Sequence, residues 1–170
     1  MRIAVAGGTG VVGRHAVEAA RAAGHEVVVL SRSSGADVLT GAGLDERMQG
    51  ADAVIDVTNT TTLSAAKAVK FFETATRNLL AAESRAGVTH HVALSIVGID
   101  GIDASYYAGK LAQERAVAAG SVPFTIARAG QFHEFAGQLL SRMSGPVAVL
   151  PKLLMLSLIH ISEPTRRRGI

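Results

Sequence analysis

A glycine-rich turn near the start of the chain constrains the fold more than any other stretch. The short apolar run at residues 2–7 is typical of a buried strand, and it leads into AGGTGVVG, in which Gly7, Gly10 and Gly13 have the spacing GxxGxxG. A helix is predicted over residues 11–23. A strand, a glycine loop and a helix in this order are typical of a turn that binds a dinucleotide phosphate.

Each glycine of the turn has a physical reason. Gly7 permits the tight turn, Gly10 lets the backbone approach a pyrophosphate, and Gly13 lets the helix pack against the strand. The free N–H groups at the start of the helix attract phosphate, together with the helix dipole. A tight turn without a ligand is the alternative.

The rest of the chain alternates predicted strands with predicted helices. Further strands are expected at residues 26–32, 52–59, 90–98 and 123–129. Further helices are expected at residues 64–86, where Ala68, Phe72, Ala75, Leu79, Ala82 and Ala86 form one stripe, at 105–119 with Ser105 as N-cap, and around Phe132, Phe135, Leu139 and Met143. This alternation predicts an α/β fold, a Rossmann-type doubly wound parallel sheet with the strand order 3-2-1-4-5.

Composition limits the kinds of protein to which the chain can belong. Hydrophobic residues make up 48% and charged residues 18%, which predicts one globular domain, and the absence of cysteine excludes disulfides and thiolate metal sites. The net charge of +3 owes much to residues 156–170, and no basic patch with interleaved aromatic residues indicates nucleic-acid binding. The chain has no apolar run long enough for a bilayer and no signal peptide at its start, so we expect a cytoplasmic protein with a small-molecule partner. The sequence leaves the oligomeric state open.

The end of the second predicted strand indicates the cofactor. NAD-binding turns usually carry an acidic residue there for the ribose hydroxyls, whereas this chain has Ser31 and Arg32 and no acidic residue before Asp37. A guanidinium suits a 2′-phosphate, so NADP(H) is favoured over NAD(H). The alternative is that Arg32 stacks on the adenine or points to solvent.

Several stretches together resemble a known family. AGGTGVVG, LSRSSG, FFETATRNLLAAE, HHVALSIVGID and YYAGKLAQE are similar to the atypical short-chain dehydrogenase/reductases, in particular their NmrA-like NAD(P)-binding branch, over residues 1–155. The resemblance implies a Rossmann domain that binds NADP(H). It also implies NADPH-dependent reduction of a quinone or another carbonyl or conjugated substrate, although some members are redox-sensing regulators without turnover.

The resemblance also implies a catalytic set of Ser95, Tyr106 and Lys110, the last two in the arrangement YxxxK. Residues at i and i+4 share a helix face, so the lysine can lower the pKa of the tyrosine and hold the nicotinamide ribose. The phenol would then donate a proton to the oxygen being reduced, which Ser95 would orient. The alternative is that Tyr106 and Tyr107 only cap and pack the helix.

The remaining candidates concern the cofactor, the substrate and metals. The expected cofactor-binding residues are Gly7, Thr9, Gly10, Val11, Val12, Gly13, Ser31, Arg32, Thr58, Asn59 and Lys110. Gln131, Phe132 and His133 could line the substrate site. His90 and His91 point to opposite faces of a strand and cannot bind one metal together, so no metal is expected, while Asp52 and Asp56 are expected to bind loop N–H groups.

The last residues of the chain do not resemble the rest. LSLIHISEPTR, residues 156–166, resembles a translated sequencing-library adapter, because one reading of the adapter DNA encodes each of these residues in turn. We therefore expect a Rossmann domain over residues 1–155, cut short at its C-terminus, and a non-native segment at 156–170.

The leading hypothesis is an NADP(H)-dependent oxidoreductase, with a non-catalytic NADP(H)-sensing regulator as the alternative. An enzyme acting on nucleotide sugars on the same fold is a third possibility, which Arg32 disfavours.

Overall fold

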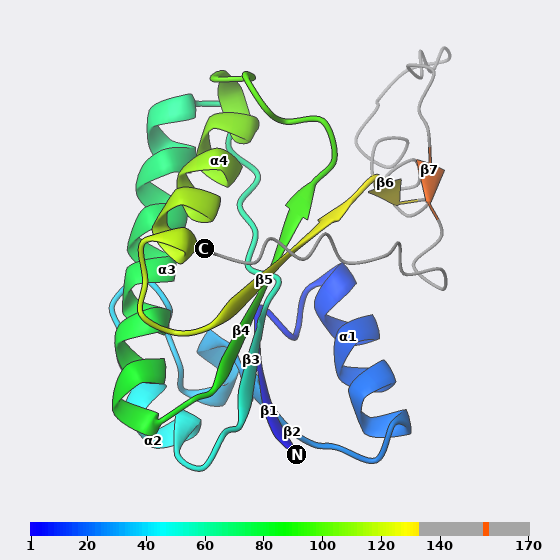
Figure 1. Cartoon of the computed structure of the whole chain (residues 1–170), viewed down its shortest axis with the longest axis vertical. Helices are drawn as coiled ribbons and strands as arrows, with labels where there is room; N and C mark the ends of the chain where they lie inside the picture. Colours follow the sequence, from blue (N-terminus) through cyan, green and yellow to red (C-terminus); the bar gives the residue numbers. More distant parts are fainter. Residues whose placement is uncertain (133–154, 157–170) are drawn as a thin grey trace.

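One sheet of five parallel strands organises the chain (Figure 1). The computed structural model describes residues 1–132 and 155–156. The strands of this sheet are β1 (Arg2–Ala6), β2 (Glu26–Leu30), β3 (Ala53–Asp56), β4 (His90–Ile96) and β5 (Phe124–Ala129). The helices are α1 (Val11–Ala22), the 3₁₀ helix η1 (Arg32–Ser34), α2 (Leu44–Met48), α3 (Ala65–Ala86) and α4 (Ser105–Ala118). Two short strands, β6 (Gln131–Phe132) and β7 (Met155–Leu156), pair with each other in parallel.

The strand order is β2-β1-β3-β4-β5, which confirms the Rossmann-type α/β class but makes the expected order 3-2-1-4-5 wrong. The third strand pairs with β1, where Ala6 is opposite Asp56, and not with β2. The expected order places the third strand beyond β2, whereas β3 pairs with β1 on the side away from β2. β2 is therefore an edge strand of this sheet, and the next strand lies on the other side of β1.

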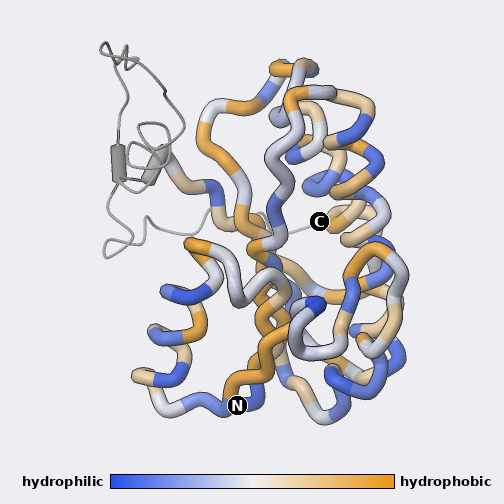
Figure 2. Tube along the Cα trace, turned by 180° about the vertical axis from the view of Figure 1, so that it is seen from behind, coloured by the Kyte–Doolittle hydropathy of each residue, from blue (hydrophilic) through white to orange (hydrophobic). Residues whose placement is uncertain are grey.

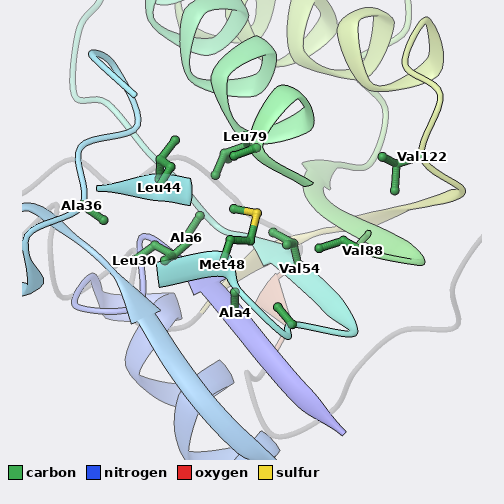
Figure 3. Close-up of a cluster of buried hydrophobic side chains, with 12 residues drawn as sticks. Ala4, Ala6, Leu30, Ala36, Leu44, Met48, Val54, Leu79, Val88 and Val122 are labelled. Carbon is green, nitrogen blue, oxygen red and sulfur yellow. The ribbon is translucent and has the colours of Figure 1, made fainter. Parts of the chain in front are cut away.

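Helices cover both faces of the sheet, α1 on one face and α2, α3 and α4 on the other, as Figures 1 and 2 show from opposite sides. β1 alternates between the two faces: Ile3 and Val5 pack with Val17 of α1, whereas Ala4 and Ala6 belong to the core cluster on the face of α2 and α3. Figure 3 shows this cluster, which includes Leu30, Leu44, Met48, Val54 and Leu79. Because β1 is buried on both faces, the loop that follows it starts from a fixed position.

The apolar stripe predicted for the long helix is confirmed on α3. Ala68, Phe72, Ala75, Leu79 and Ala82 are fully buried, and Ala86 packs partly buried against the core. The helix begins after Ser64, whose hydroxyl accepts the backbone N–H of Lys67, and ends at Gly87 with a φ of 71°.

Two helix predictions need correction. Ser105 is not the N-cap of α4, because Ala104 occupies that position without a side-chain hydrogen bond and Ser105 is the first helical residue. Ser105 has a φ of 52°, so the backbone turns sharply where it enters the helix. This left-handed conformation costs a serine conformational energy.

Phe132 belongs to β6 and not to a helix, because its backbone pairs with β7. Phe135, Leu139 and Met143 lie outside the described residues, and the expected boundary after residue 155 stays a prediction.

The sheet order defines a switch point between β1 and β3. The chain leaves β1 on one side to form β2 and returns on the other side to form β3, so the loops after these strands separate at that position. Ligands of open α/β sheets bind at the carboxyl ends of the strands beside such a switch point. The loops after β1, β2 and β3 all start at this edge.

A buried ion pair connects α3 to β4. Nδ1 of His91 donates to Oε1 of Glu83 at 2.8 Å, and both side chains are fully buried. Burial alone lowers the pKa of His91, but the hydrogen bond and charge of Glu83, with a smaller contribution from Asp56, outweigh it and raise the pKa above 6.5. The folded protein therefore binds this proton more tightly than the unfolded chain.

We predict that the pair stabilises the fold most at low pH. Its contribution is full below the ordinary histidine pKa of 6.5 and is lost as the pH rises through the higher pKa of the folded protein. At pH 6, His91→Phe should lower the free energy of unfolding by about 3–5 kcal/mol, because it leaves Glu83 buried without its partner. The double variant His91→Phe/Glu83→Met should recover most of this loss.

Urea unfolding at pH 6 and pH 9 measures both effects. The deficit of His91→Phe relative to wild type should be smaller at pH 9. Single and double variants that unfold at the same urea concentration at pH 6 would show that the pair does not act as a unit.

Candidate functional site

The glycine turn after β1 is closely packed. Gly7 has a φ of 79°, its N–H donates to the carbonyl oxygen of Leu30 at 3.1 Å, and its own carbonyl accepts the N–H of Gly10 at 2.9 Å. A Cβ at Gly13 would lie 2.1 Å from the carbonyl oxygen of Gly7, and one at Gly7 would lie 2.9 Å from that of Val57. Only glycine allows α1 and β3 to approach the turn this closely.

The start of α1 fits an anionic ligand. Gly10 is the N-cap and provides no side-chain hydrogen bond, and the first turn contains no acidic residue. The first N–H groups of a helix have no intrahelical acceptor, and here no capping side chain binds those of Val11, Val12 and Gly13. The helix dipole also favours negative charge there. Across the switch point, the hydroxyl of Thr58 is buried without a hydrogen-bond partner among the described residues. These donors fit the pyrophosphate and ribose of a dinucleotide.

The structure separates the two residues expected to read the adenosine ribose. The hydroxyl of Ser31 accepts the backbone N–H of Ser34 at 3.3 Å, and the hydroxyl of Ser34 accepts the backbone N–H of Ser31 at 3.0 Å. This reciprocal pair makes Ser31 the cap of η1. Arg32 is exposed as the first residue of η1, and its guanidinium forms no hydrogen bond or ion pair with the described part of the chain. Ser31 therefore orders the turn, while the guanidinium of Arg32 keeps its donors for a ligand.

The loop after β3 is held by a buried carboxylate. Oδ1 of Asp56 accepts the N–H of Thr58 at 2.9 Å, and the carbonyl of Ala6 accepts the N–H of Val57 at 3.0 Å. Asn59 is exposed and accepts the N–H of Thr60 at 2.7 Å. The prediction that Asp56 binds a loop N–H group is confirmed by this contact with Thr58. For Asp52 the prediction is wrong, because its carboxylate accepts the N–H of Arg2, the first residue of strand β1, at 2.7 Å.

Lys110 lies in the interior between α3, α4 and β3. Its side chain is 3% exposed, Nζ donates to Oε1 of Gln113, and the ammonium lies 4.6 Å from the centre of the Phe72 ring. Burial lowers the pKa of Lys110 to about 8, although the charges of Asp56 and Glu114 act in the opposite direction. Gly109 makes this burial possible, because a Cβ there would lie 2.7 Å from atoms of α3.

Tyr106 packs one helical turn before Lys110. Its ring makes an edge contact with Phe72 at 5.6 Å between centres and another with Tyr107 at 6.2 Å. Burial, with smaller contributions from Tyr107 and Asp56, raises the pKa of Tyr106 to about 12. This direction is opposite to the lysine-induced lowering that the YxxxK arrangement predicts, because the ammonium of Lys110 contacts Gln113 and the phenol is desolvated.

Ser95 belongs to a second polar cluster. Its hydroxyl donates to Oε1 of Glu114 at 2.5 Å, and Arg128 donates to both oxygens of Glu114 at 2.9 and 2.6 Å and to Asp100 at 2.6 and 2.9 Å. These hydrogen bonds raise the pKa of Arg128. Within the described residues, no side-chain hydrogen bond joins any two of Ser95, Tyr106 and Lys110.

The structure thus brings together the phosphate turn, Arg32 and the loop of Thr58, but it gives each proposed catalytic residue a different partner. Sequence reasoning missed Gln113 and Glu114, which hold Lys110 and Ser95 respectively. Their positions three and four residues after Lys110 were a signal, since those positions share its helix face. Gln131 and Phe132 form β6, and His133 lies outside the described residues.

Two hollows lie along the edges of the sheet, away from the switch point. One of about 440 Å³ runs beside β2, lined by Arg2, Arg21, Arg47 and neighbouring residues, and one of about 280 Å³ lies between α4 and β5. Among the described residues, no group of three His, Asp or Glu side chains could hold a metal ion, and no helix is long and apolar enough to span a bilayer.

We predict that two glycines of the turn separate stability from binding. Gly13→Ala should lower the free energy of unfolding by about 1–3 kcal/mol, because its methyl group collides with the carbonyl of Gly7. Gly10→Ala has its nearest contact at 3.2 Å and should cost at most about 1 kcal/mol, but its methyl group would obstruct a phosphate.

Urea unfolding and NADPH titration of the same samples distinguish the two effects. The account of the turn would be contradicted by a Gly13→Ala protein as stable as wild type, or by wild-type NADPH affinity in Gly10→Ala.

Solved structures share this fold. A short-chain dehydrogenase/reductase superfamily protein from Agrobacterium tumefaciens with bound NAD is 24% identical, with a TM-score of 0.64 over 78% of this chain and 50% of that one. Triphenylmethane reductase from Citrobacter sp., complexed with NADP(H), is 18% identical, with a TM-score of 0.66 over 80% and 52% of the two chains. NADPH-dependent quinone oxidoreductase from Escherichia coli is 19% identical, with a TM-score of 0.64 over 82% and 53%. The chain spans about half the length of these three proteins.

Sequence comparison gives the family. No curated protein sequence matches this chain. The model of one family, described as the NAD dependent epimerase/dehydratase family, matches residues 3–101, more than half of the 170 residues. The matched region contains the glycine turn, the loop of Thr58 and Ser95, the parts that form the carboxyl edge of the sheet. The chain therefore belongs to the NAD-dependent epimerase/dehydratase family.

Proposed function

We propose that the protein binds NADP(H) and works as an oxidoreductase that transfers hydride to a small carbonyl, quinone or conjugated substrate. The observation that carries the cofactor choice is the exposed Arg32 at the carboxyl end of β2, beside the phosphate turn. Ser31 caps η1 and so fixes the backbone position of Arg32, the first residue of that helix. No carboxylate lies between Leu30 and Ala36 to repel a 2′-phosphate or to bind the ribose hydroxyls of NAD.

The fit of the remaining donors supports the same proposal. The N–H groups of Val11, Val12 and Gly13 would bind the pyrophosphate, and Thr58 and Asn59 would face the dinucleotide from the other side of the switch point. Bound NADPH would supply hydride chemistry at its nicotinamide. The chain would position it and exclude water.

The proton would come from Tyr106. A phenol with a pKa near 12 keeps its proton at neutral pH, so it is available to an oxygen that gains negative charge. Lys110 would hold the nicotinamide ribose and Ser95 would orient the substrate oxygen. In this assignment Ser95 exchanges its contact with Glu114 for the substrate oxygen. Lys110 keeps its contact with Gln113 and uses another of its three N–H donors for the ribose.

Sequence similarity supports the proposed substrate class. The similarity of residues 1–155 to the NmrA-like branch, whose members reduce quinones and conjugated carbonyls, favours that substrate class. We expect the protein to act in the cytoplasm on a small molecule.

The second candidate is a non-catalytic sensor of NADP(H). The observation that favours it is the set of separate contacts around the catalytic residues. Ser95 is bound to Glu114, Lys110 to Gln113, and Tyr106 packs against Phe72. A sensor needs the phosphate turn and Arg32 but has no need for the phenol.

We predict a preference for NADPH over NADH of about 10- to 150-fold, from roughly 1.5–3 kcal/mol for a charge-assisted contact. Arg32→Ala should remove most of the preference and leave NADH affinity nearly unchanged. The preference should shrink with added salt, because Arg32 is exposed.

Titration of both dinucleotides at low and moderate salt measures this, with Arg21→Ala as control. Arg21 is also exposed but lies at the far end of α1, so its removal changes the net charge equally without touching the turn. Equal affinities of the wild type for NADPH and NADH would overturn the cofactor assignment.

We predict further that Tyr106→Phe lowers kcat for NADPH-dependent quinone reduction by about 100-fold or more, with little change in cofactor affinity. The phenylalanine ring keeps the packing against Phe72, so the fold is retained. Tyr107→Phe is the matched control and should retain most of the rate. Unchanged turnover in Tyr106→Phe would contradict the proposed role of this phenol, and no turnover by wild type that binds NADPH would favour the sensor.

A further inference from the structure

A chain of buried hydrogen bonds runs from the loop after β3 to α4. Oδ1 of Asp56 accepts the N–H of Thr58 at 2.9 Å, and its Oδ2 accepts Nε2 of Gln113 at 2.7 Å. Oε1 of Gln113 in turn accepts from Nζ of Lys110. Asp56 is fully buried, Gln113 is 1% exposed and Lys110 is 3% exposed, so water does not compete for these contacts.

The donors and acceptors of this series of hydrogen bonds can be arranged in only one way. A carboxylate accepts hydrogen bonds and an ammonium donates them, so the amide between them must present its nitrogen to Asp56 and its oxygen to Lys110. The reversed amide would place oxygen against oxygen at Asp56 and nitrogen against nitrogen at Lys110. The charge of Asp56 thereby sets the orientation of Gln113, and Gln113 sets the position of the ammonium.

Other charged groups near Lys110 are few and identifiable. Glu114 on the same helix contributes a negative charge to Lys110, but its hydrogen bonds go to Ser95 and Arg128. α3 presents the uncharged ring of Phe72 to the ammonium. The ion pair of His91 and Glu83 interacts with the charge of Asp56 and does not contact Lys110.

We propose that Asp56 and Gln113 are positioning residues that couple the cofactor loop at Thr58 to Lys110. The proposal rests on the proposed function where it gives Lys110 a role at the ribose. One carboxylate fixes the loop through one oxygen and the lysine through the other. A dinucleotide that displaces Thr58 therefore changes the hydrogen bonding of Lys110, and the protonation of Lys110 changes the hydrogen bond at Thr58.

The test follows both ends of the chain by NMR during a pH titration of the intact protein without added dinucleotide. In wild type, the ¹⁵N and ¹³Cε signals of Lys110 should titrate with a midpoint near 8. The amide proton of Thr58 should shift with the same midpoint. Coupling through Asp56 predicts this shared midpoint, while a network that only fills the core predicts a Thr58 signal that ignores Lys110.

Two variants interrupt the series of hydrogen bonds at different positions. Gln113→Leu removes the acceptor of the ammonium, and Asp56→Asn removes the negative charge while keeping the side-chain shape. Both changes disfavour the charged lysine, so the midpoint of Lys110 should fall by about 1 unit or more in each. In Gln113→Leu, the Thr58 signal should stop following Lys110.

A second glutamine provides the matched control. Gln49→Leu, the same substitution at an exposed position, should leave the titration of Lys110 unchanged. If Gln113→Leu does not fold, Asp56→Asn and the shared midpoint in wild type still decide the outcome. An unchanged Lys110 midpoint in the folded variants, or a wild-type Thr58 signal that does not follow Lys110, would overturn the coupling.

A separate NADPH titration keeps the two proposals apart. If wild type binds NADPH, both variants should bind it several-fold more weakly, because Lys110 is no longer held in place. If wild type binds no NADPH, the proposed function fails, whereas the NMR titration still decides the coupling.

Discussion

The buried carboxylate of Asp56 is the interaction on which the candidate site depends most. It lies at the end of β3, opposite Ala6 of β1, so it stands at the switch point of the sheet. Its two oxygens bind the N–H of Thr58 and the amide of Gln113, and through the amide it reaches Lys110. A charge with no exposure to water requires this degree of hydrogen bonding. The carboxylate therefore connects the sheet, the cofactor loop and α4.

Close packing at the switch point provides the second constraint. α1 approaches so near that no side chain at Gly13 would fit against Gly7, and α4 approaches α3 closely at Gly109, where a Cβ would lie 2.7 Å from atoms of α3. Both approaches occur on elements that hold functional groups, the free N–H groups of α1 and the ammonium of Lys110. Glycine is thus used on both faces of the sheet to bring helix atoms to the carboxyl edge.

The sequence predicted the parts of the fold that depend on local pattern. The glycine spacing located the turn, the stripe through Phe72 and Leu79 located α3, and Gly87 located its end. Strand order was not predictable in the same way, because the local pattern locates the third strand but does not reveal on which side of the sheet it pairs. The contacts of Ser95, Tyr106 and Lys110 were missed for a related reason. Motif spacing places residues on a shared face but does not reveal Gln113 or Glu114 as their nearest partners.

The central claim is that a dinucleotide binds at the carboxyl edge of the sheet, at the switch point between β1 and β3. Its most direct test is a map of backbone amide shifts in ¹⁵N–¹H spectra as NADPH is added. The account predicts saturable shifts concentrated at residues 7–13, at Arg32 and at Thr58 and Asn59. Shifts concentrated in the hollow beside β2 or in the one between α4 and β5, with the glycine turn unchanged, would contradict it.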